Sequence, residues 1–245
     1  NPIESVLSVN RDLQKEKGYQ LIIGMDSDAD RLGIIDENGI YVDNNEILAV
    51  IYYYLVKYKN QSGDIVKNIA TSNLIDKLAT QLGYKCHTVD VGFKNISKAI
   101  LDNNALIGGE SSGGLTIRNF IMGKDSTLST LLILEILTKI DKPFSVIVKE
   151  VREFTNYFNK TIEDELRFKN KENIIEKAKN LNIENVVIKE TIIFNANIKY
   201  IIGDNEWILL RFSGTEPLLR LFIESDDLKK TKNIMSSVKS LLEGL

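Results

Sequence analysis

Cysteine, histidine and proline are scarce in this sequence, with one Cys, one His and three Pro in 245 residues. The lone Cys86 excludes an internal disulfide and fits a reducing compartment. No apolar run reaches the roughly 18 residues of a membrane span, and a net charge of -3 gives no electrostatic case for nucleic acid or anionic membranes. We therefore expect a cytoplasmic protein without nucleic-acid or membrane partners. Because the first residue is Asn rather than Met, we also expect a processed chain or a piece of a longer one.

The most informative stretch is residues 21–35, where two apolar runs suited to strands flank an acidic loop. Asp26, Asp28 and Asp30 recur at every second position, and carboxylates at this spacing repel one another. A chain tolerates such a cluster most readily when a divalent cation lies among the carboxylates. Oxygen ligands without Cys or His nearby favour Mg²⁺, Mn²⁺ or Ca²⁺ over zinc. Arg31 beside the cluster indicates an anionic partner such as a phosphate.

Three other interpretations of the acidic loop stay open at this point. A solvated acidic turn between two strands needs no metal. An EF-hand shares the Asp spacing, but it requires a Gly where this chain has Arg31, and flanking helices in place of the predicted strands. A haloacid-dehalogenase phosphatase would use Asp26 as nucleophile and Thr71 or Ser72 as its later hydroxyl group, although Thr or Val usually stands at the position of Asp30.

Beyond this loop, strand and helix patterns alternate. Strands are predicted at 65–70, 84–89 and 105–108, with helices at 74–82 and 94–101 between them. Such alternation is typical of parallel βαβ units, in which ligands bind at the carboxyl ends of the strands. After Lys142-Pro143 the pattern changes to an α+β one. The other expected elements are helices at 4–17, 44–59, 128–140, 143–152, 171–180 and 228–242 and strands at 186–194, 199–202, 207–212 and 219–224.

Two loops at the ends of predicted strands, residues 90–94 and 108–114, have a composition that suits ligand binding. Residues 108–114 read Gly-Gly-Glu-Ser-Ser-Gly-Gly, in which glycines allow close backbone approach while Glu110 and Ser112 offer hydrogen bonds to sugar hydroxyls. An ordinary glycine-rich turn is the alternative. Lys94 follows another predicted strand, where a lysine can contact a phosphate or transfer a proton, although most lysines are solvated surface groups.

A fourth loop, at residues 211–220, reads Arg-Phe-Ser-Gly-Thr-Glu-Pro-Leu-Leu-Arg. Its central Ser-Gly-Thr can form a nest of backbone N–H groups with two hydroxyls, and Arg211 and Arg220 add positive charge. Together these groups can satisfy a phosphate dianion. A plain hairpin turn would need Gly214 but neither arginine.

The four loops, in this order, resemble those of the α-D-phosphohexomutase family of phosphoglucomutases and phosphomannomutases. The family's metal loop reads Asp-Gly-Asp-Ala-Asp-Arg, its sugar loop Gly-Gly-Glu-x-Ser-Gly and its phosphate loop Arg-x-Ser-Gly-Thr-Glu-Pro. The likeness spans nearly the whole chain. It implies an α/β fold with a phosphoglucomutase-like mixed-sheet domain of parallel βαβ units, followed by a smaller α+β C-terminal domain. We expect the end of the second family domain at 1–42, a sugar-binding α/β domain at 43–146 and a phosphate-binding α+β domain at 147–245.

The resemblance also implies a role for each matching residue. Asp26, Asp28 and Asp30 would hold Mg²⁺, and Arg31 and Lys94 would flank the transferring phosphoryl group. The residues expected to bind the substrate are Glu110 and Ser112 for sugar hydroxyls, and Arg211, Ser213, Gly214, Thr215 and Arg220 for the phosphate that is not transferred.

This chain departs from the family pattern in several places. Ser27 and Ser126 replace glycines, and Ser111 replaces a common Glu. The family's phosphorylated serine lies in a Ser-His-Asn-Pro type motif, which is absent here because the only histidine, His87, is followed by Thr88. We therefore expect that an N-terminal serine domain of the same protein is missing from this chain and that the fragment is inactive alone.

The predicted function is the C-terminal portion of a phosphohexomutase, which moves a phosphoryl group between the 1- and 6-positions of a hexose phosphate. Phosphoserine and a hexose bisphosphate intermediate are implied by the family. The sequence does not choose among glucose, mannose, glucosamine and pentose phosphates. A non-catalytic sugar-phosphate-binding protein and a dehalogenase-type phosphatase remain the alternatives.

Overall fold

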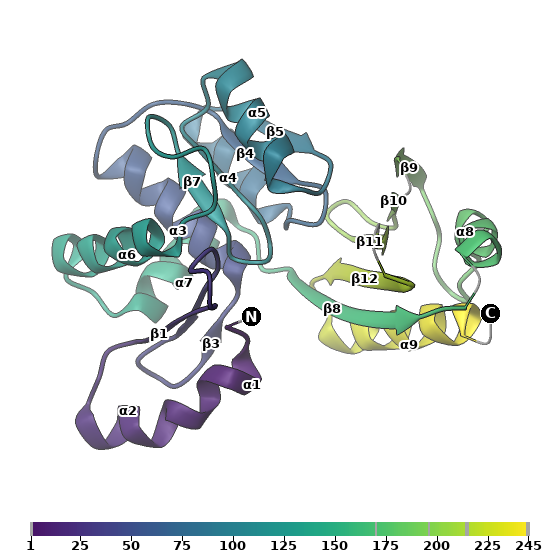
Figure 1. Ribbon diagram of the computed structural model, residues 1–245, viewed down its shortest axis with the longest axis horizontal. Coiled ribbons are helices and arrows are strands. Elements are labelled where there is room, and N and C mark those ends of the chain that lie inside the picture. The colour runs from purple at the N-terminus through teal and green to yellow at the C-terminus, as the bar shows by residue number, and fades with distance from the viewer. Residues whose placement is uncertain (1, 170, 196, 214–215, 244–245) are drawn as a thin grey trace. The chain divides into compact units, whose positions relative to one another are not determined.

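The computed structural model describes residues 2–169, 171–195, 197–213 and 216–243. Two compact units, Asn1–Tyr157 and Phe158–Leu245, make up the chain (Figure 1). Over the described residues, no helix combines the length and the apolar character needed to cross a membrane.

The first unit opens with short helices and a three-stranded antiparallel sheet. Strands β1 (Ile22–Met25), β2 (Leu32–Ile35) and β3 (Tyr41–Val42) pair in that order. The single helix expected at 4–17 is instead α1 (Glu4–Leu7), a 3₁₀ turn, η1 (Ser8–Asn10), and α2 (Arg11–Lys17). Gly18 ends α2 in the left-handed conformation, with φ 65°.

A four-stranded mixed sheet forms the centre of the first unit. Its order is β5-β4-β6-β7, with β4 (Ile65–Asn68), β5 (Cys86–Val89) and β6 (Ile107–Gly109) parallel and β7 (Leu115–Ile117) antiparallel to β6. Helices α4 (Leu74–Leu82) and α5 (Phe93–Asn103) are the crossovers. The predicted parallel βαβ units are therefore confirmed, whereas β7 was not predicted. The carboxyl ends of β4, β5 and β6 share one edge of the sheet.

Helices cover both faces of this sheet. Neighbouring residues of β4 face opposite ways: Ile65 lies in the large core with α3 (Asn44–Lys57), α4, α6 (Ser126–Ile140) and α7 (Phe144–Thr155), and Val66 packs with α5. Helix α3 is capped by Asp43. The expected domain boundary after residue 146 falls inside α7, and the first compact unit ends at Tyr157. The three-part division stays a prediction.

The second unit is an antiparallel sheet with helices. The strand order is β8-β12-β11-β10-β9, with β8 (Lys160–Arg167), β9 (Glu190–Phe194), β10 (Asn197–Ile201), β11 (Trp207–Phe212) and β12 (Leu218–Ser225). Helices α8 (Lys171–Lys179) and α9 (Leu228–Leu242) complete it. Residues from β10, β11, β12, α8 and α9 form one buried core. This architecture confirms the predicted α+β character, although β8 was missed.

A buried ion pair joins α3 to α7. Arg152 donates from Nε and Nη2 to Glu46 Oε1 at 3.0 and 2.8 Å, and both side chains are about nine-tenths buried. Glu46 also accepts from the Asp43 backbone N–H as part of a capping box. Removing the arginine would leave a buried carboxylate without its counter-charge.

We predict that Arg152→Ala lowers the free energy of unfolding by roughly 3–5 kcal/mol, because breaking one side of a buried pair leaves an uncompensated charge. Urea denaturation of the chain measures the loss. Lys149→Ala is the matched control on the same helix, since Lys149 makes an exposed pair with Glu153 at 3.6 Å. Such a pair contributes about 1 kcal/mol or less. Equal losses of unfolding free energy in the two variants would contradict the stabilising role of the Arg152–Glu46 pair.

Candidate functional site

The acidic loop connects β1 to β2 and folds back on itself. Ala29 takes a positive φ of 54°, and its N–H donates to the Asp26 carbonyl at 3.0 Å. Asp26 Oδ1 accepts from the backbone N–H groups of Asp30 and Arg31 at 3.1 and 3.0 Å. As a result, one carboxylate oxygen from each of Asp26, Asp28 and Asp30 lies within 4.8 Å of the others. The structure therefore brings the three predicted metal ligands together.

Positive groups oppose the negative charge of this loop. Arg31 Nε lies 3.8 Å from Asp26 Oδ2 and 3.5 Å from Asp30 Oδ1, and Lys124 Nζ forms an ion pair with Asp30 Oδ2. Desolvation raises the pKa of Asp26, but backbone hydrogen bonds from Arg31 and Asp30 and the Arg31 charge outweigh it, so the pKa lies below its ordinary value. Lys124 had no role in the sequence analysis, because 94 residues separate it from Asp30 along the chain.

The acidic loop is fastened to the 108–114 loop and to the start of α6. The Leu32 N–H donates to Gly113 O at 3.4 Å, and Ser126 donates from N and Oγ to Ala29 O at 2.9 and 2.7 Å. Gly113 has a φ of 94°, and a Cβ there would lie 2.5 Å from Leu32 O. Glycine at 113 is therefore required both by the backbone conformation and by close approach.

Glu110 follows β6 at the carboxyl edge of the mixed sheet and is 8% exposed. Its backbone closes a tight turn, with the Glu110 N–H donating to Gly114 O at 2.9 Å and the Gly113 N–H donating to Glu110 O at 3.0 Å. Ser112, at the tip of the turn, is exposed. The loop thus presents a buried carboxylate and an exposed hydroxyl within one turn.

Asn68, the last residue of β4, holds Glu110 from the neighbouring strand. Its Nδ2 donates to Glu110 Oε1 at 3.1 Å, and its Oδ1 accepts from the Ala70 N–H and from Thr71 Oγ1 at 3.0 and 2.9 Å. Thr71 Oγ1 in turn accepts from the Ser111 N–H at 3.2 Å. The loop after β4 therefore positions the 108–114 loop through side chains that the sequence analysis did not single out for this role.

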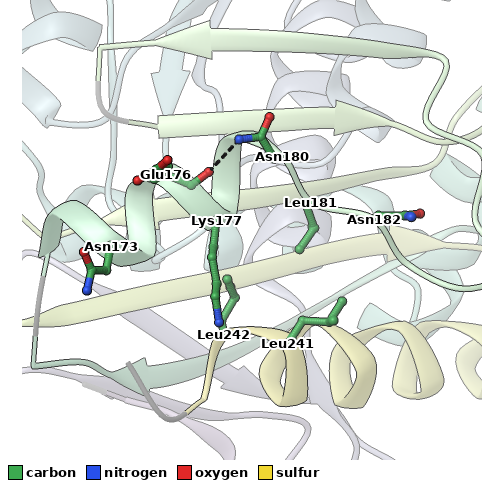
Figure 2. A pocket seen from close by; sticks show the side chains of 8 residues that line it. All are labelled: Asn173, Glu176, Lys177, Asn180, Leu181, Asn182, Leu241 and Leu242. Carbon is green, nitrogen blue, oxygen red and sulfur yellow. Dashed lines mark hydrogen bonds between the residues drawn. The ribbon is translucent and has the colours of Figure 1, made fainter.

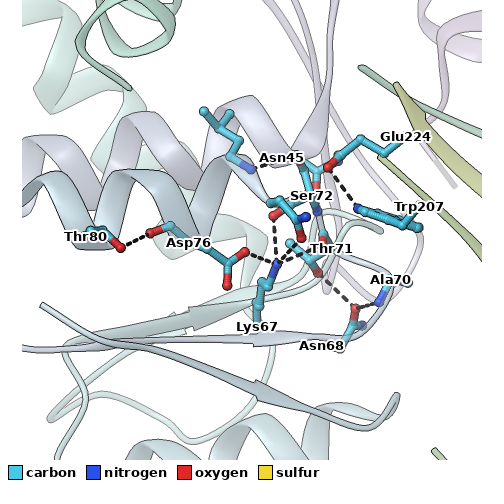
Figure 3. Close-up of polar contacts among 12 residues, drawn as sticks. Asn45, Lys67, Asn68, Ala70, Thr71, Ser72, Asp76, Thr80, Trp207 and Glu224 are labelled. Carbon is cyan, nitrogen blue, oxygen red and sulfur yellow. Dashed lines mark hydrogen bonds and ion pairs between the residues drawn. The ribbon is translucent and has the colours of Figure 1, made fainter. Parts of the chain in front are cut away.

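A buried lysine organises the loop after β4 (Figure 3). Lys67 is 2% exposed, and its Nζ donates to Thr71 O, Ser72 O and Asn73 Oδ1 at 3.2, 3.1 and 3.3 Å and forms an ion pair with Asp76. These acceptors satisfy the ammonium group in the sheet interior. The Lys-Asn pair that ends an otherwise apolar strand was the signal available in the sequence.

Lys94, which was predicted to flank the transferring phosphoryl group with Arg31, is not joined to the acidic loop in the part of the chain that the structure describes. It is exposed at the second position of α5, just after the Gly92 N-cap, at the carboxyl end of β5. Parallel pairing of β4 with β5 and β6 places this end at the same sheet edge as Glu110. Among the described residues, no ion pair links Lys94 to Asp26, Asp28 or Asp30.

The predicted phosphate-binding residues lie in the second unit. Arg211 in β11 is directly opposite Arg220 in β12, and the Ser213 N–H donates to Leu218 O at 2.9 Å. Ser213 Oγ accepts from the Glu216 N–H at 3.2 Å. Gly214 and Thr215, also predicted for this loop, lie outside the described residues.

The second unit also holds a cavity of about 540 Å³ between α8 and the end of α9. Its lining includes Asn173, Lys177, Asn180 and Leu242, and Asn180 Nδ2 donates to the Glu176 carbonyl at 3.2 Å (Figure 2). The described lining contains none of the predicted site residues, so the site is built from loops rather than from this cavity.

Two family models match most of the chain. The alpha/beta/alpha domain III of phosphoglucomutase/phosphomannomutase matches residues 43–154, and the C-terminal domain of the same family matches residues 164–240. The chain belongs to the phosphoglucomutase/phosphomannomutase family. The family resemblance and the fold class predicted from the sequence are thereby confirmed.

Individual relatives agree with this family. The phosphoglucomutase/phosphomannomutase of Thermococcus kodakarensis is 32% identical over 99% of this chain and 51% of its own length. The phosphoglucosamine mutase of Methanocaldococcus jannaschii is 30% identical over 91% of this chain and 48% of its own length. These relatives are mutases, and the chain spans about half the length of the curated relatives it matches.

Solved structures show the same fold. A Thermus thermophilus protein described as a phosphomannomutase superposes with a TM-score of 0.82 at 25% identity, over 100% of this chain and 51% of its own. An Aspergillus fumigatus N-acetylphosphoglucosamine mutase in complex with GlcNAc-6P and magnesium has a TM-score of 0.61 at 13% identity, over 94% of this chain and 55% of its own. Structures with this fold thus include one that contains magnesium.

We predict that Thr71→Val loosens the 108–114 loop, because it removes the hydroxyl that joins the Ser111 N–H to Asn68 without changing side-chain size. Losing a hydrogen bond of about 1 kcal/mol should speed amide exchange at Ser111 by roughly fivefold to tenfold. Hydrogen exchange followed by NMR measures this. Thr80→Val is the control, since the exposed Thr80 hydroxyl donates only to the Asp76 carbonyl. Unchanged Ser111 exchange in Thr71→Val would contradict the linkage.

Proposed function

We propose that this chain is the part of a phosphohexomutase that supplies the metal, sugar and phosphate loops, and that the complete enzyme moves a phosphoryl group between the 1- and 6-positions of a hexose phosphate. One observation carries the proposal: the carboxylates of Asp26, Asp28 and Asp30 cluster beside Arg31, and the Leu32–Gly113 hydrogen bond fastens this cluster to the loop of Glu110. Charge for a phosphoryl group and acceptors for a sugar therefore lie on linked loops.

The acidic loop fits Mg²⁺ by its donor chemistry. All three candidate ligands are carboxylates, which hard divalent cations prefer. Asp30 Oδ1 is buried and accepts no hydrogen bond among the described residues. A bound cation would satisfy this buried oxygen. When bound, Mg²⁺ would supply positive charge to neutralise the transferring phosphoryl group.

The other predicted residues take roles that match their surroundings. Arg31 and Lys94 would add positive charge around the transferring phosphoryl group. Asn68 holds one oxygen of Glu110, so the carboxylate is oriented to accept sugar hydroxyls together with Ser112. For the phosphate that is not transferred, the proposed ligands are Arg211, Ser213, Gly214, Thr215 and Arg220.

The implied reaction has two balanced steps. A phosphoserine gives its phosphoryl group to a hydroxyl of the sugar monophosphate, which yields a bisphosphate and a free serine. The serine then accepts the phosphoryl group from the other end of the bisphosphate. We propose that the serine comes from another domain of the same protein, because the relatives are about twice as long as the matched region. The partners would be hexose phosphates and bisphosphates in the cytoplasm.

We predict that the chain alone, given glucose 1-phosphate, Mg²⁺ and a trace of glucose 1,6-bisphosphate, produces no glucose 6-phosphate, because its sequence contains no Ser-His-Asn-Pro type motif. Extending the chain through its in-frame upstream coding region should restore conversion, and Asp28→Asn in that longer protein should lower kcat by at least about tenfold. A coupled glucose 6-phosphate dehydrogenase assay measures the rate.

Three outcomes would contradict this proposal. Appreciable turnover by the chain alone would show that no serine domain is needed. Release of inorganic phosphate that Asp26→Asn abolishes would favour the dehalogenase-type phosphatase. An extended protein that binds glucose 6-phosphate but never isomerises any hexose phosphate would favour the non-catalytic sugar-phosphate-binding protein.

A further inference from the structure

The proposed phosphate loop shares one sheet face with two carboxylates. In the register of the second unit, Arg211 lies opposite Arg220, and Arg220 lies opposite Glu165 of β8. Glu163 is two residues from Glu165 on the same strand, so it points to the same face. These two guanidinium and two carboxylate groups therefore lie on one face, which Arg167 at the end of β8 shares.

Of the two carboxylates, Glu163 is the one that pairs with Arg220. The distance from Arg220 Nη1 to Glu163 Oε1 is 3.7 Å, with Arg220 38% and Glu163 50% exposed. Burial raises the pKa of Glu163 above its ordinary value, although the charges of Arg220 and Arg211 partly offset this rise. Arg220 is therefore within ion-pair distance of Glu163, and Arg211 lies opposite Arg220 on the same face.

We propose that Glu163 is a competing carboxylate that occupies Arg220 until a phosphate displaces it, and so limits the affinity of this loop for phosphate. The inference rests on the proposed function of the 211–220 loop. A phosphate dianion bound by Arg220 must separate the arginine from Glu163 and then lie near a like charge. Each effect weakens phosphate binding.

A moderate phosphate affinity of this loop would help a reaction in which each end of the sugar must in turn reach the serine. In the proposed two-step transfer, the bisphosphate must release the phosphate loop before its other end can be presented to the serine. A loop that held phosphate with two unopposed arginines would slow this release, because affinity within one site is tuned mostly through the dissociation rate. Glu163 would set that rate without contacting the reacting atoms.

A phosphate titration followed by the NMR shifts of the Ser213 and Phe212 amides tests the proposal. It is done at about pH 8, where inorganic phosphate is mainly a dianion. We predict that Glu163→Gln tightens binding by about twofold to fivefold, the range for a partly exposed ion pair. Glu165→Gln is the matched control, because it removes the same charge from the same strand and face and leaves the Glu163–Arg220 pair intact. Its gain should be smaller. High salt should reduce the gain of Glu163→Gln.

If Glu163→Gln binds phosphate no more tightly than Glu165→Gln does, the inference about Glu163 is wrong. The proposed phosphate loop would still be supported if Arg220→Met abolished phosphate binding. Absence of saturable phosphate binding in the wild-type chain and in both glutamine variants would overturn the inference and the proposed phosphate site together. A tighter Glu163→Gln variant is not expected from a merely structural role of Glu163, since a damaged site loses affinity.

Discussion

Repulsion among like charges is the constraint on which the candidate site depends. Three carboxylate oxygens lie within 4.8 Å of one another on a loop of five residues. Backbone N–H groups directed at Asp26, the cations Arg31 and Lys124, and the turn at Ala29 together hold them there. Hydrogen bonds also join the acidic loop to Gly113 and Ser126. The geometry of the acidic cluster and the placement of the 108–114 loop therefore depend on each other.

The same electrostatic arrangement recurs in the second unit with the signs exchanged. There, the arginines of the proposed phosphate site lie on the same sheet face as carboxylates of β8. In each unit the ligand would have to compete with an internal counter-ion, such as Lys124 for Asp30 or Glu163 for Arg220. Internal counter-ions of this kind offset part of the charge of each cluster before a ligand arrives, and so reduce the repulsion within the folded chain.

Local sequence patterns predicted the elements and loops that depend on neighbouring residues. Helices α4 and α9 span 74–82 and 228–242 as expected, and the Asp spacing predicted a cluster. Contacts between distant segments were not predictable. Strand β8 is rich in charge and is held by pairing along its whole length with β12, and β7 has three residues held by β6. In the first unit, Lys124 and Asn68 contact candidate site residues only through the tertiary fold, and in the second unit the same holds for Glu163 and Arg220.

Binding of a divalent cation by the isolated chain tests the central claim most directly, because it requires neither the serine nor a sugar. Mn²⁺ titration followed by electron paramagnetic resonance separates bound from free ion. We predict one saturable site that Asp28→Asn weakens by at least about tenfold, since affinity depends on ligand charge. Asp102→Asn, which alters an exposed aspartate on α5, should have no effect. Equal Mn²⁺ affinity in Asp28→Asn and the unaltered chain, or no saturable binding at millimolar Mn²⁺, would contradict the central claim.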